Sequence, residues 1–524
     1  MITIPGLEGG VVPSTALAVI PVIIFIAYLI AFPVSMDPQE PRLVRPTIPF
    51  IGHIVGLFQH SWRYLYMVHA KNPAPILTLP MLNGKVYVVS DPDLTLVALR
   101  NRSLSFDPFL SDIIQGMTKA TPETMSIYND PAFFGAWIKI IYGGMAGQSL
   151  LHLNLSALGN IADRMNAIDG HEVQVEDLYL WNRELLTLAS TDSLYGSKNP
   201  LKADKSLIDA YWDFEANVHK LMPGILPSLV APRGHRGKKR LQQALTEYFD
   251  AHHDEGLDVP PLVRDRRKLS ASFNMTSAAA AGIELMFIHG AISNTFPTYY
   301  WFFTRVFSQP ALVARLRAEA QGVLEEKGRA AVGGEEKRVV TLHFEKIEER
   351  CPLLMSCFRE THRLSAEGIL VRKVLADTTI SDGKTTYALK KDWQLQAPQK
   401  VLQTSPEIWG EDAAEFVGDR FLNMAEEKGE AVVNFAARGF IAFGAGKHIC
   451  PGRYFASGEL LGSLALLVAG FDVISSEGDT IQVPKASGIP LTGSIGKPVA
   501  GDWSEPFRHM FANRTRTWAG FFHT

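Results

Sequence analysis

Residues 443–453 read F-G-A-G-K-H-I-C-P-G-R, and this stretch decides what the chain folds around. It holds three glycines: Gly444, Gly446 and Gly452. Without side chains there, a flat group can approach the sulfur of Cys450, and backbone N–H groups stay free to point at that sulfur. Pro451 suits the start of a helix, whose N-terminus favours an anionic thiolate, and His448 can donate to a buried carboxylate. The stretch therefore predicts that Cys450 is a thiolate ligand of iron in a flat cofactor.

The same stretch closely resembles the haem-binding signature of the cytochrome P-450 superfamily, and the resemblance extends along nearly all of the chain. Residues 360–363 (E-T-H-R), about ninety positions before Cys450, resemble the E-x-x-R pair of that family. Residues 416–421 (F-V-G-D-R-F) resemble its F-x-P-x-R-F element, with Gly418 where proline is usual. The resemblance implies a mainly α fold with a smaller β region.

The charged residues of these two elements are expected to stabilise the fold. One helical turn puts Glu360 and Arg363 on the same face, where they can pair. The resemblance implies that Arg420 completes this cluster. Its role is structural, since buried charges need partners.

The resemblance also implies a cofactor, haem b (iron protoporphyrin IX), with Cys450 as its axial ligand. The residues expected to bind it are Cys450, His448, Phe443, Gly444, Gly452 and Arg372. Arg372, twelve positions after Glu360, falls where the family often has a propionate-binding arginine; a surface arginine at a strand edge is the alternative. The family's W-x-x-x-R pattern is absent, because Ile141 stands four residues after Trp137, so the propionate partner at that place stays open.

A second motif with a chemical role lies at residues 291–296 (A-I-S-N-T-F), which match the family's oxygen-activating helix. Asn294 replaces the usual acid, and Thr295 is expected beside the distal oxygen site. The run N-T-x-P-x-x-x-W from Asn294 to Trp301 resembles the subgroup of sterol 7α-hydroxylases and prostacyclin synthase. Asn cannot titrate but can orient a water. The alternative is a polar residue that only bends the helix beside Pro297.

Two activities follow from the resemblance. The first is a haem-thiolate monooxygenase that hydroxylates or similarly oxidises a lipophilic small molecule, such as a terpenoid, sterol or polyketide of secondary metabolism. Its partners are O2 and an NADPH-dependent flavoprotein reductase, docked near Lys447 and Arg453. The second is a redox-neutral isomerase or dehydratase. The expected pocket, or plain core, residues are Phe287, Ala291, Leu370 and Ile489 beside Thr295.

The N-terminal region predicts a membrane anchor. Residues 16–34 are 19 positions without a charge, and the first basic residues, Arg42 and Arg45, follow them. We expect a short segment at 1–15, a transmembrane helix at 16–34 and a proline-rich strap at 35–53. The body then faces the cytoplasm, with the endoplasmic reticulum as the expected membrane. A cleaved signal peptide is the alternative.

Composition excludes several classes of protein. Hydrophobic residues make up 47% of the 524, which is too many for a disordered chain, and the formal net charge of −3 gives no basic excess for nucleic acid. Three cysteines are too few for a disulfide scaffold or a four-cysteine cluster. Length alone suggests about three domains. The motifs nevertheless predict a single haem-binding catalytic domain over 54–524.

Patterning within the body predicts its elements. An Asn83-Gly84 turn predicts a hairpin of 76–79 with 86–89, followed by a helix capped by Asp91. Residues 145–365 read as mostly helical, with 319–339 a solvated helix end and loop. Strand-like pieces are expected at 369–375, 386–397 and 480–495. The apolar run 222–232, with basic residues after it, is either a surface loop or a second membrane-dipping element.

Overall fold

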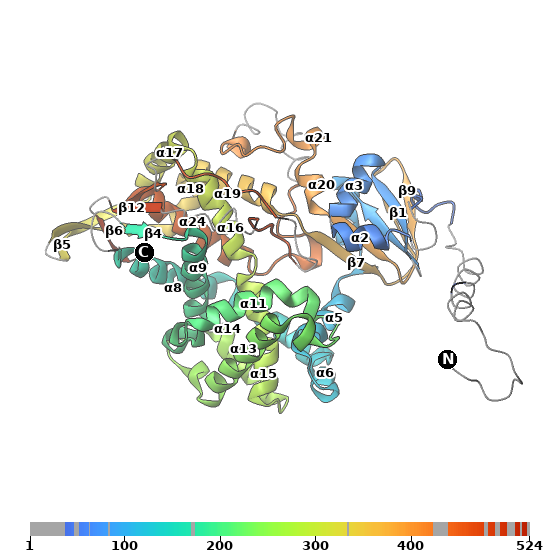
Figure 1. The fold of residues 1–524 in the computed structure, drawn as a ribbon, viewed down its shortest axis with the longest axis horizontal. Helices are drawn as coiled ribbons and strands as arrows, with labels where there is room; N and C mark the ends of the chain where they lie inside the picture. The colour runs from blue at the N-terminus through green and yellow to red at the C-terminus, as the bar shows by residue number, and fades with distance from the viewer. Residues whose placement is uncertain are drawn as a thin grey trace, which may run out of the picture.

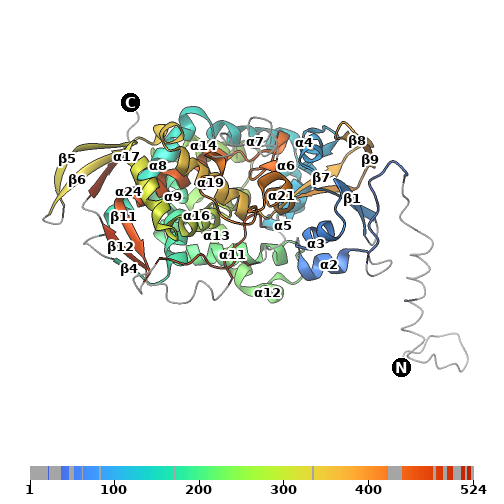
Figure 2. The ribbon, with the colours of Figure 1, turned by 90° about the horizontal axis from the view of Figure 1, so that it is seen from above.

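The computed structural model describes residues 37–46, 52–61, 63–81, 84–168, 173–332, 335–422, 439–475, 480–487, 493–499, 509–513 and 516–520, together with Val22. Within this part the chain is mainly helical with smaller sheets, as the sequence predicted (Figure 1). The largest sheet lies at one end of the molecule and a β5–β6 hairpin at the other (Figures 1 and 2).

The largest sheet contains the hairpin that the Asn83-Gly84 turn predicted. Its strands run in the order β1 (Ile76–Met81), β2 (Gly84–Val89), β10 (Gln394–Pro398), β7 (Ile369–Val374) and β3 (Leu104–Ser105). β1 and β2 pair antiparallel, β10 joins β2 in parallel, and β7 returns antiparallel to β10. β7 thereby carries residues 369–374 from the sheet toward the centre of the chain's helical part.

The described part of the proline-rich segment lies against this sheet. The Val44 N–H donates to the Thr78 carbonyl at 2.9 Å, the Thr78 N–H donates to the Arg42 carbonyl at 2.9 Å, and Leu43 forms a parallel bridge to Thr78. Glu40, 8% exposed, pairs with Lys85 and accepts from the Tyr87 hydroxyl. These contacts tie an extended segment, whose prolines disfavour helix, to the edge of β1.

Helices form the rest of the body. In chain order they are α2 (Ile54–His60), α3 (Arg63–Lys71), α4 (Pro92–Arg100), α5 (Asp107–Thr118), α6 (Pro122–Tyr128), α7 (Pro131–Gly144), α8 (Gly147–Asn166), α9 (Leu178–Tyr195), α10 (Pro200–Ala203), α11 (Ser206–Leu221), α12 (Pro227–Val230), α13 (Pro232–Asp250), α14 (Pro261–Ser272), α15 (Ser277–Ile292), α16 (Thr295–Phe307), α17 (Pro310–Gln321), α18 (Ile347–Arg350), α19 (Pro352–Ser365), α20 (Gln399–Gln403), α21 (Pro406–Trp409) and α24 (Arg453–Gly470). Asp91 caps α4 as predicted, because its side chain accepts from the Leu94 N–H. α24 is apolar on nearly every face and is buried accordingly.

One expectation for the body was wrong. The segment 319–339 is not a loop after its helix end: β5 (Leu324–Val332) and β6 (Glu335–Leu342) form an antiparallel hairpin there, and β13 (Arg516–Gly520) extends it. The strands read L-E-E-K-G-R-A-A-V and E-E-K-R-V-V-T-L, and the β-branched run Val339–Thr341 in β6 favours a strand. The described residues of 480–495 form only isolated bridges, at Ala486 and Ile495.

The remaining strands are small. β4 (Val173–Val175) and β12 (His509–Asn513) join β11 (Phe471–Ile474), and β8 (Thr378–Ser381) pairs with β9 (Thr386–Leu389). Among the described residues, no helix is both long and apolar enough to cross a membrane. The expected anchor at 16–34 and the segment 1–15 lie outside the described residues, apart from Val22.

Candidate functional site

The loop before α24 has the tight backbone that its glycines predicted. Gly444 and Gly446 adopt left-handed φ values of 73° and 68°. A Cβ on Gly446 would lie 2.3 Å from the Leu99 carbonyl oxygen, so only glycine fits this close approach to α4. The Cys450 N–H donates to the Phe443 carbonyl at 3.0 Å, which closes the loop under the sulfur.

The environment of Cys450 differs from that of the other two cysteines. Burial raises the pKa of the Cys450 thiol, while N–H groups of Gly452 and Arg453 and the charge of Arg453 oppose that rise. Cys351 and Cys357 are fully buried. Burial raises the pKa of Cys351 to about 12, and that of Cys357 also rises strongly. Cys450 is therefore the cysteine with an accessible sulfur and hydrogen-bond donors for a thiolate.

Cys450 lines a cavity whose other walls come from α15, α16, α19, β7 and α24. Nine residues singled out from the sequence line this cavity: Ala291, Asn294, Thr295, Leu370, Phe443, Gly444, His448, Cys450 and Gly452. Segments 150 residues apart in the chain thus meet around one space. Phe287 is not among the lining residues; its ring packs 3.5 Å from the guanidinium of the buried Arg266. Ile489 lies outside the described residues.

The helix expected over the cofactor is broken into α15 and α16 at Ser293 and Asn294. Pro297 has no N–H to donate back to the Ser293 carbonyl, which explains the break. The Thr295 hydroxyl donates to the Ala291 carbonyl at 2.7 Å and the Thr298 hydroxyl to the Asn294 carbonyl at 2.8 Å. Asn294 is exposed to the cavity, so its amide is free to orient a ligand or water there.

Cationic and polar groups gather beside the loop of Cys450. Arg372 is 3% exposed, and burial lowers its pKa to about 10. Its Nε is buried without a partner among the described residues, as is the Nε1 of Trp137 on α7. His448 lies 3.7 Å from the Asp107 carboxylate, and Lys447 pairs with the same carboxylate at 2.9 Å.

These observations form a test of whether haem fits the cavity. The site offers an accessible sulfur with N–H donors, a glycine loop that a side chain would block, and buried donors that lack acceptors. Haem carries two carboxylates and an iron that takes thiolate ligands. Arg372, whose Nη2 donates to the Ala445 carbonyl in the loop of Cys450 at 3.5 Å, is suited to bind a carboxylate there through its unpartnered Nε, and Cys450 is suited to bind the iron. The residues present fit the group.

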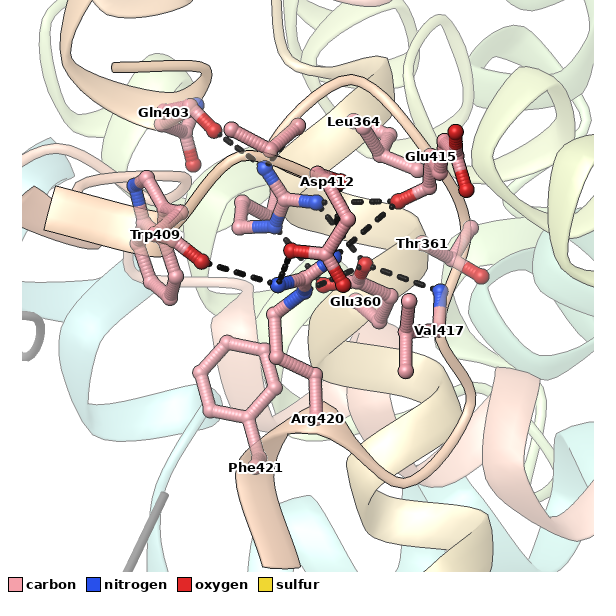
Figure 3. Close-up of polar contacts among 12 residues, drawn as sticks. Glu360, Thr361, Leu364, Gln403, Trp409, Asp412, Glu415, Val417, Arg420 and Phe421 are labelled. Atoms are coloured by element: carbon pink, nitrogen blue, oxygen red, sulfur yellow. Dashed lines mark hydrogen bonds and ion pairs between the residues drawn. The ribbon is translucent and has the colours of Figure 1, made fainter. Parts of the chain in front are cut away.

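Glu360 lies at the centre of a buried ion-pair cluster (Figure 3). Both its oxygens bind Arg363, at 2.7 and 2.8 Å, and Oε1 also accepts from Arg420 Nε at 2.9 Å and from the Val417 N–H at 3.1 Å. Arg420 reaches Asp412 at 2.8 Å. The three side chains grouped from the sequence therefore lie together, and α19 is fixed to the 412–420 segment.

Comparison with known proteins agrees with this geometry. The sequence model of the family described as Cytochrome P450 matches residues 236–494. A cytochrome P450 monooxygenase of Gibberella zeae is 32% identical over 471 residues, which cover 89% of this chain and 88% of that protein. This chain belongs to the cytochrome P450 family. As a cytochrome P450 it is an oxidoreductase, and its cofactor is haem with an axial cysteine thiolate.

This cytochrome P450 is also similar to other proteins of the family. Cytochrome P450 monooxygenase nodJ of Hypoxylon pulicicidum is 28% identical over 92% of both chains. The 7-alpha-hydroxycholest-4-en-3-one 12-alpha-hydroxylase of Oryctolagus cuniculus is 24% identical over 83% of this chain and 87% of its own. The similarity to sterol hydroxylases agrees with the subgroup that the N-T-x-P-x-x-x-W run indicated.

Sequence reasoning missed several residues of the cavity wall. Thr298 could have been found, because it lies one helical turn after Thr295 on the same face. Gln399, which donates to the Ile441 carbonyl at 2.6 Å, and His362 come from elements whose approach to Cys450 no local pattern encodes. His362 was read only as a spacer between Glu360 and Arg363.

Proposed function

We propose that this cytochrome P450 is a monooxygenase that inserts one oxygen atom of O2 into a lipophilic small molecule. The observation that carries the proposal is the meeting of Cys450 with Thr295 and Asn294 around one cavity. Electrons come from NADPH through a flavoprotein reductase. When bound, the haem supplies an iron at which O2 is reduced, and thiolate ligation favours cleavage of the O–O bond.

The chain's own residues handle protons and exclude water. Thr295 keeps its hydroxyl proton on the Ala291 carbonyl, which leaves oxygen lone pairs open to accept from a water in the cavity. Asn294 presents an amide N–H2 and a carbonyl that can hold the same water. Neither group titrates near neutral pH, so they orient a proton donor rather than act as the acid themselves.

The substrate is expected to be lipophilic because most of the lining is apolar. Leu370, Ala442, Phe455, Leu460 and Ile495 contribute to the wall. A sterol, terpenoid or polyketide fits this lining, and the similarity to sterol 12-alpha-hydroxylases supports the first of these. At the start of α16, the polar side chains of Asn294, Thr295 and Thr298 line the cavity and can bind a hydroxyl or carbonyl of the substrate.

The reductase is proposed to dock on the face of Cys450. Arg453 donates to the Cys450 carbonyl and stacks on Tyr454, which is 57% exposed. Lys447 is largely exposed although it pairs with Asp107. Surface charges such as these steer association with an acidic partner more than they add affinity. Lys447→Glu should therefore slow reduction by the reductase most at low ionic strength.

Membrane attachment is also proposed, with the catalytic body on the cytoplasmic side of the endoplasmic reticulum. The apolar segment 16–34 supports it, together with an exposed patch around α12. Ile225, Leu226, Leu229 and Val230 on this patch are 50–73% exposed. Basic residues of α13 follow it directly. A fluorophore on Leu229→Cys should be quenched by brominated lipid, whereas one on Leu257→Cys, at a fully exposed site, should not.

Asn294 also favours a second candidate, a redox-neutral rearrangement of a peroxide, because that chemistry needs no proton relay. The two functions differ in what turnover requires. Purified protein with reductase, NADPH and 18O2 should yield product with one 18O atom from candidate sterols or terpenoids. Turnover of a peroxide substrate without NADPH or O2 would overturn the monooxygenase proposal in favour of the isomerase.

A further inference from the structure

His362 is a buried histidine in the wall of the cofactor cavity. It lies on α19 between Glu360 and Arg363, which form the ion-pair cluster on the other side of the helix. The side chain is 4% exposed and lines the same cavity as Cys450. Nothing in the proposed monooxygenase chemistry uses it.

Both nitrogens of this imidazole are buried without a hydrogen-bond partner in the described part of the chain. The ring is held between two aromatic side chains, with centroids 4.6 Å from Phe358 and 4.6 Å from Phe443. A buried donor without an acceptor costs about 1–3 kcal/mol, so such a group usually has a partner. His362 lines the cavity, so a group bound there is the one from which either nitrogen could gain a partner.

The chemistry of the cofactor determines whether the imidazole donates or accepts a hydrogen bond. Burial lowers the pKa of His362 to about 3, so the ring is neutral and carries one N–H. Iron protoporphyrin has no N–H of its own, whereas its carboxylates, its π-face and its axial sulfur all accept hydrogen bonds. Any hydrogen bond between His362 and haem therefore requires the imidazole to donate.

We propose that His362 contacts the haem as a positioning residue and raises the reduction potential of its iron through an N–H directed into the cavity. The inference rests on haem binding at Cys450. Reduction adds negative charge to the cofactor, and an N–H dipole in a low-dielectric site stabilises that charge. An apolar residue in this position gives the iron a lower potential and a smaller tendency to accept the first electron.

Two substitutions separate the N–H from the ring. His362→Phe keeps an aromatic ring between Phe358 and Phe443 but removes the donor. His362→Gln removes the ring but keeps an N–H donor. Reduction potentials are measured by spectroelectrochemical titration of the full-length, haem-loaded protein without substrate, and thermal unfolding reports packing.

The proposal expects His362→Phe to reduce the reduced-to-oxidised ratio about tenfold at a fixed applied potential, a shift of about −59 mV for one electron. His362→Gln should stay close to wild type in potential even if its thermal stability falls. Phe358→Leu, which disturbs the same packing without touching a nitrogen, should also keep the wild-type potential.

Three results would overturn the inference. The first is an unchanged potential in His362→Phe, and the second is a shift in His362→Gln and Phe358→Leu that matches the shift in His362→Phe. The third is a higher potential in His362→Phe. Haem content and the ferrous–CO spectrum of each variant distinguish these results from a failure of haem binding at Cys450, which would remove the spectrum in wild-type protein as well.

Discussion

Glu360 accepts a hydrogen bond from Arg420 at 2.9 Å, although sixty positions separate the two residues in the chain. Both side chains are buried, at 0% and 6% exposure, and Glu360 binds Arg363 at the same time. This contact links α19, which carries His362 into the cavity wall, to the segment that precedes the loop of Cys450. The Glu360, Arg363 and Arg420 side chains of this network are therefore shielded from solvent.

The first prediction concerns this network. Arg420→Met leaves the buried Glu360 carboxylate with one cationic partner instead of two, so the free energy of unfolding should fall by about 3–5 kcal/mol. The free energy of unfolding is measured by chemical denaturation, with circular dichroism as the probe. Arg315→Met is the matched control, because Arg315 pairs with Asp419 at an exposed site and its loss should cost under about 1 kcal/mol. Equal losses in the two variants would contradict a structural role for the network.

The second prediction concerns Glu459, a fully buried carboxyl on α24 that accepts from the Ser190 hydroxyl. Burial raises its pKa from 4.5 to about 8. The folded protein keeps this proton where the unfolded chain has lost it, so stability falls as pH rises from about 4.5 to 8. The slope from this group is about 1.4 kcal/mol per pH unit.

Glu459→Gln removes that titration and leaves the rest of the site in place. Its stability relative to wild type should therefore be higher at pH 8 than at pH 5, as measured by urea denaturation at both values. A stability difference that does not change with pH would show that Glu459 is ionised in the folded protein.

The third prediction concerns the oxygen side of the cavity. Thr295→Ala removes a hydroxyl that lines the cavity, so a several-fold larger share of NADPH should end as hydrogen peroxide rather than product. Thr304→Ala is the control on the same helix: its hydroxyl makes the same type of bond, to the Tyr300 carbonyl at 2.9 Å, but does not line the cavity. The check is the ratio of peroxide to NADPH consumed with reductase and a bound lipophilic ligand. Similar peroxide yields from both variants would rule out a role for Thr295 in proton handling.

The fourth prediction concerns Arg372. Its unpartnered Nε is expected to bind a haem carboxylate, so Arg372→Met should release haem to apomyoglobin about tenfold faster, the equivalent of one charged hydrogen bond. Arg317→Met serves as a control because Arg317, although half-buried, donates only to carbonyls and Asp472 at the far end of α24. If both variants released haem at the wild-type rate, Arg372 would be a strand arginine without contact to the cofactor.

The sequence predicted what local chemistry determines. The loop around Cys450, the Glu360–Arg363 turn, the Asn83-Gly84 hairpin and the Asp91 cap each depend on neighbours within a few residues. The β5–β6 hairpin was missed because the charged residues at 325–329 and 335–338 are those expected of a solvated loop, although Val340, Thr341 and Leu342 at the end of β6 are buried. The break at Asn294 was visible in Pro297, yet only the structure places it at the cavity.

Long-range packing determines the parts of the cavity that the sequence did not predict. His362 and Gln399 line the cavity because α19 and α20 approach the loop of Cys450, and no spacing in the sequence encodes that approach. Phe287 was expected in the pocket from its position before Ala291. It packs instead on Arg266 of α14, whose guanidinium forms a buried pair with Glu284, which lies on α15 as Phe287 does. Helical periodicity gives the direction of a side chain but not the partner it meets.

The most direct test of the whole account is the ferrous–CO spectrum of Cys450→Ala. Wild-type protein should show the red-shifted band of thiolate-bound haem, and Cys351→Ala and Cys357→Ala should keep it, because both of those thiols are fully buried. Cys450→Ala should lose the band. If Cys450→Ala retained it, Cys450 would not be the iron ligand, and the assignment of this cavity as the haem site would be wrong.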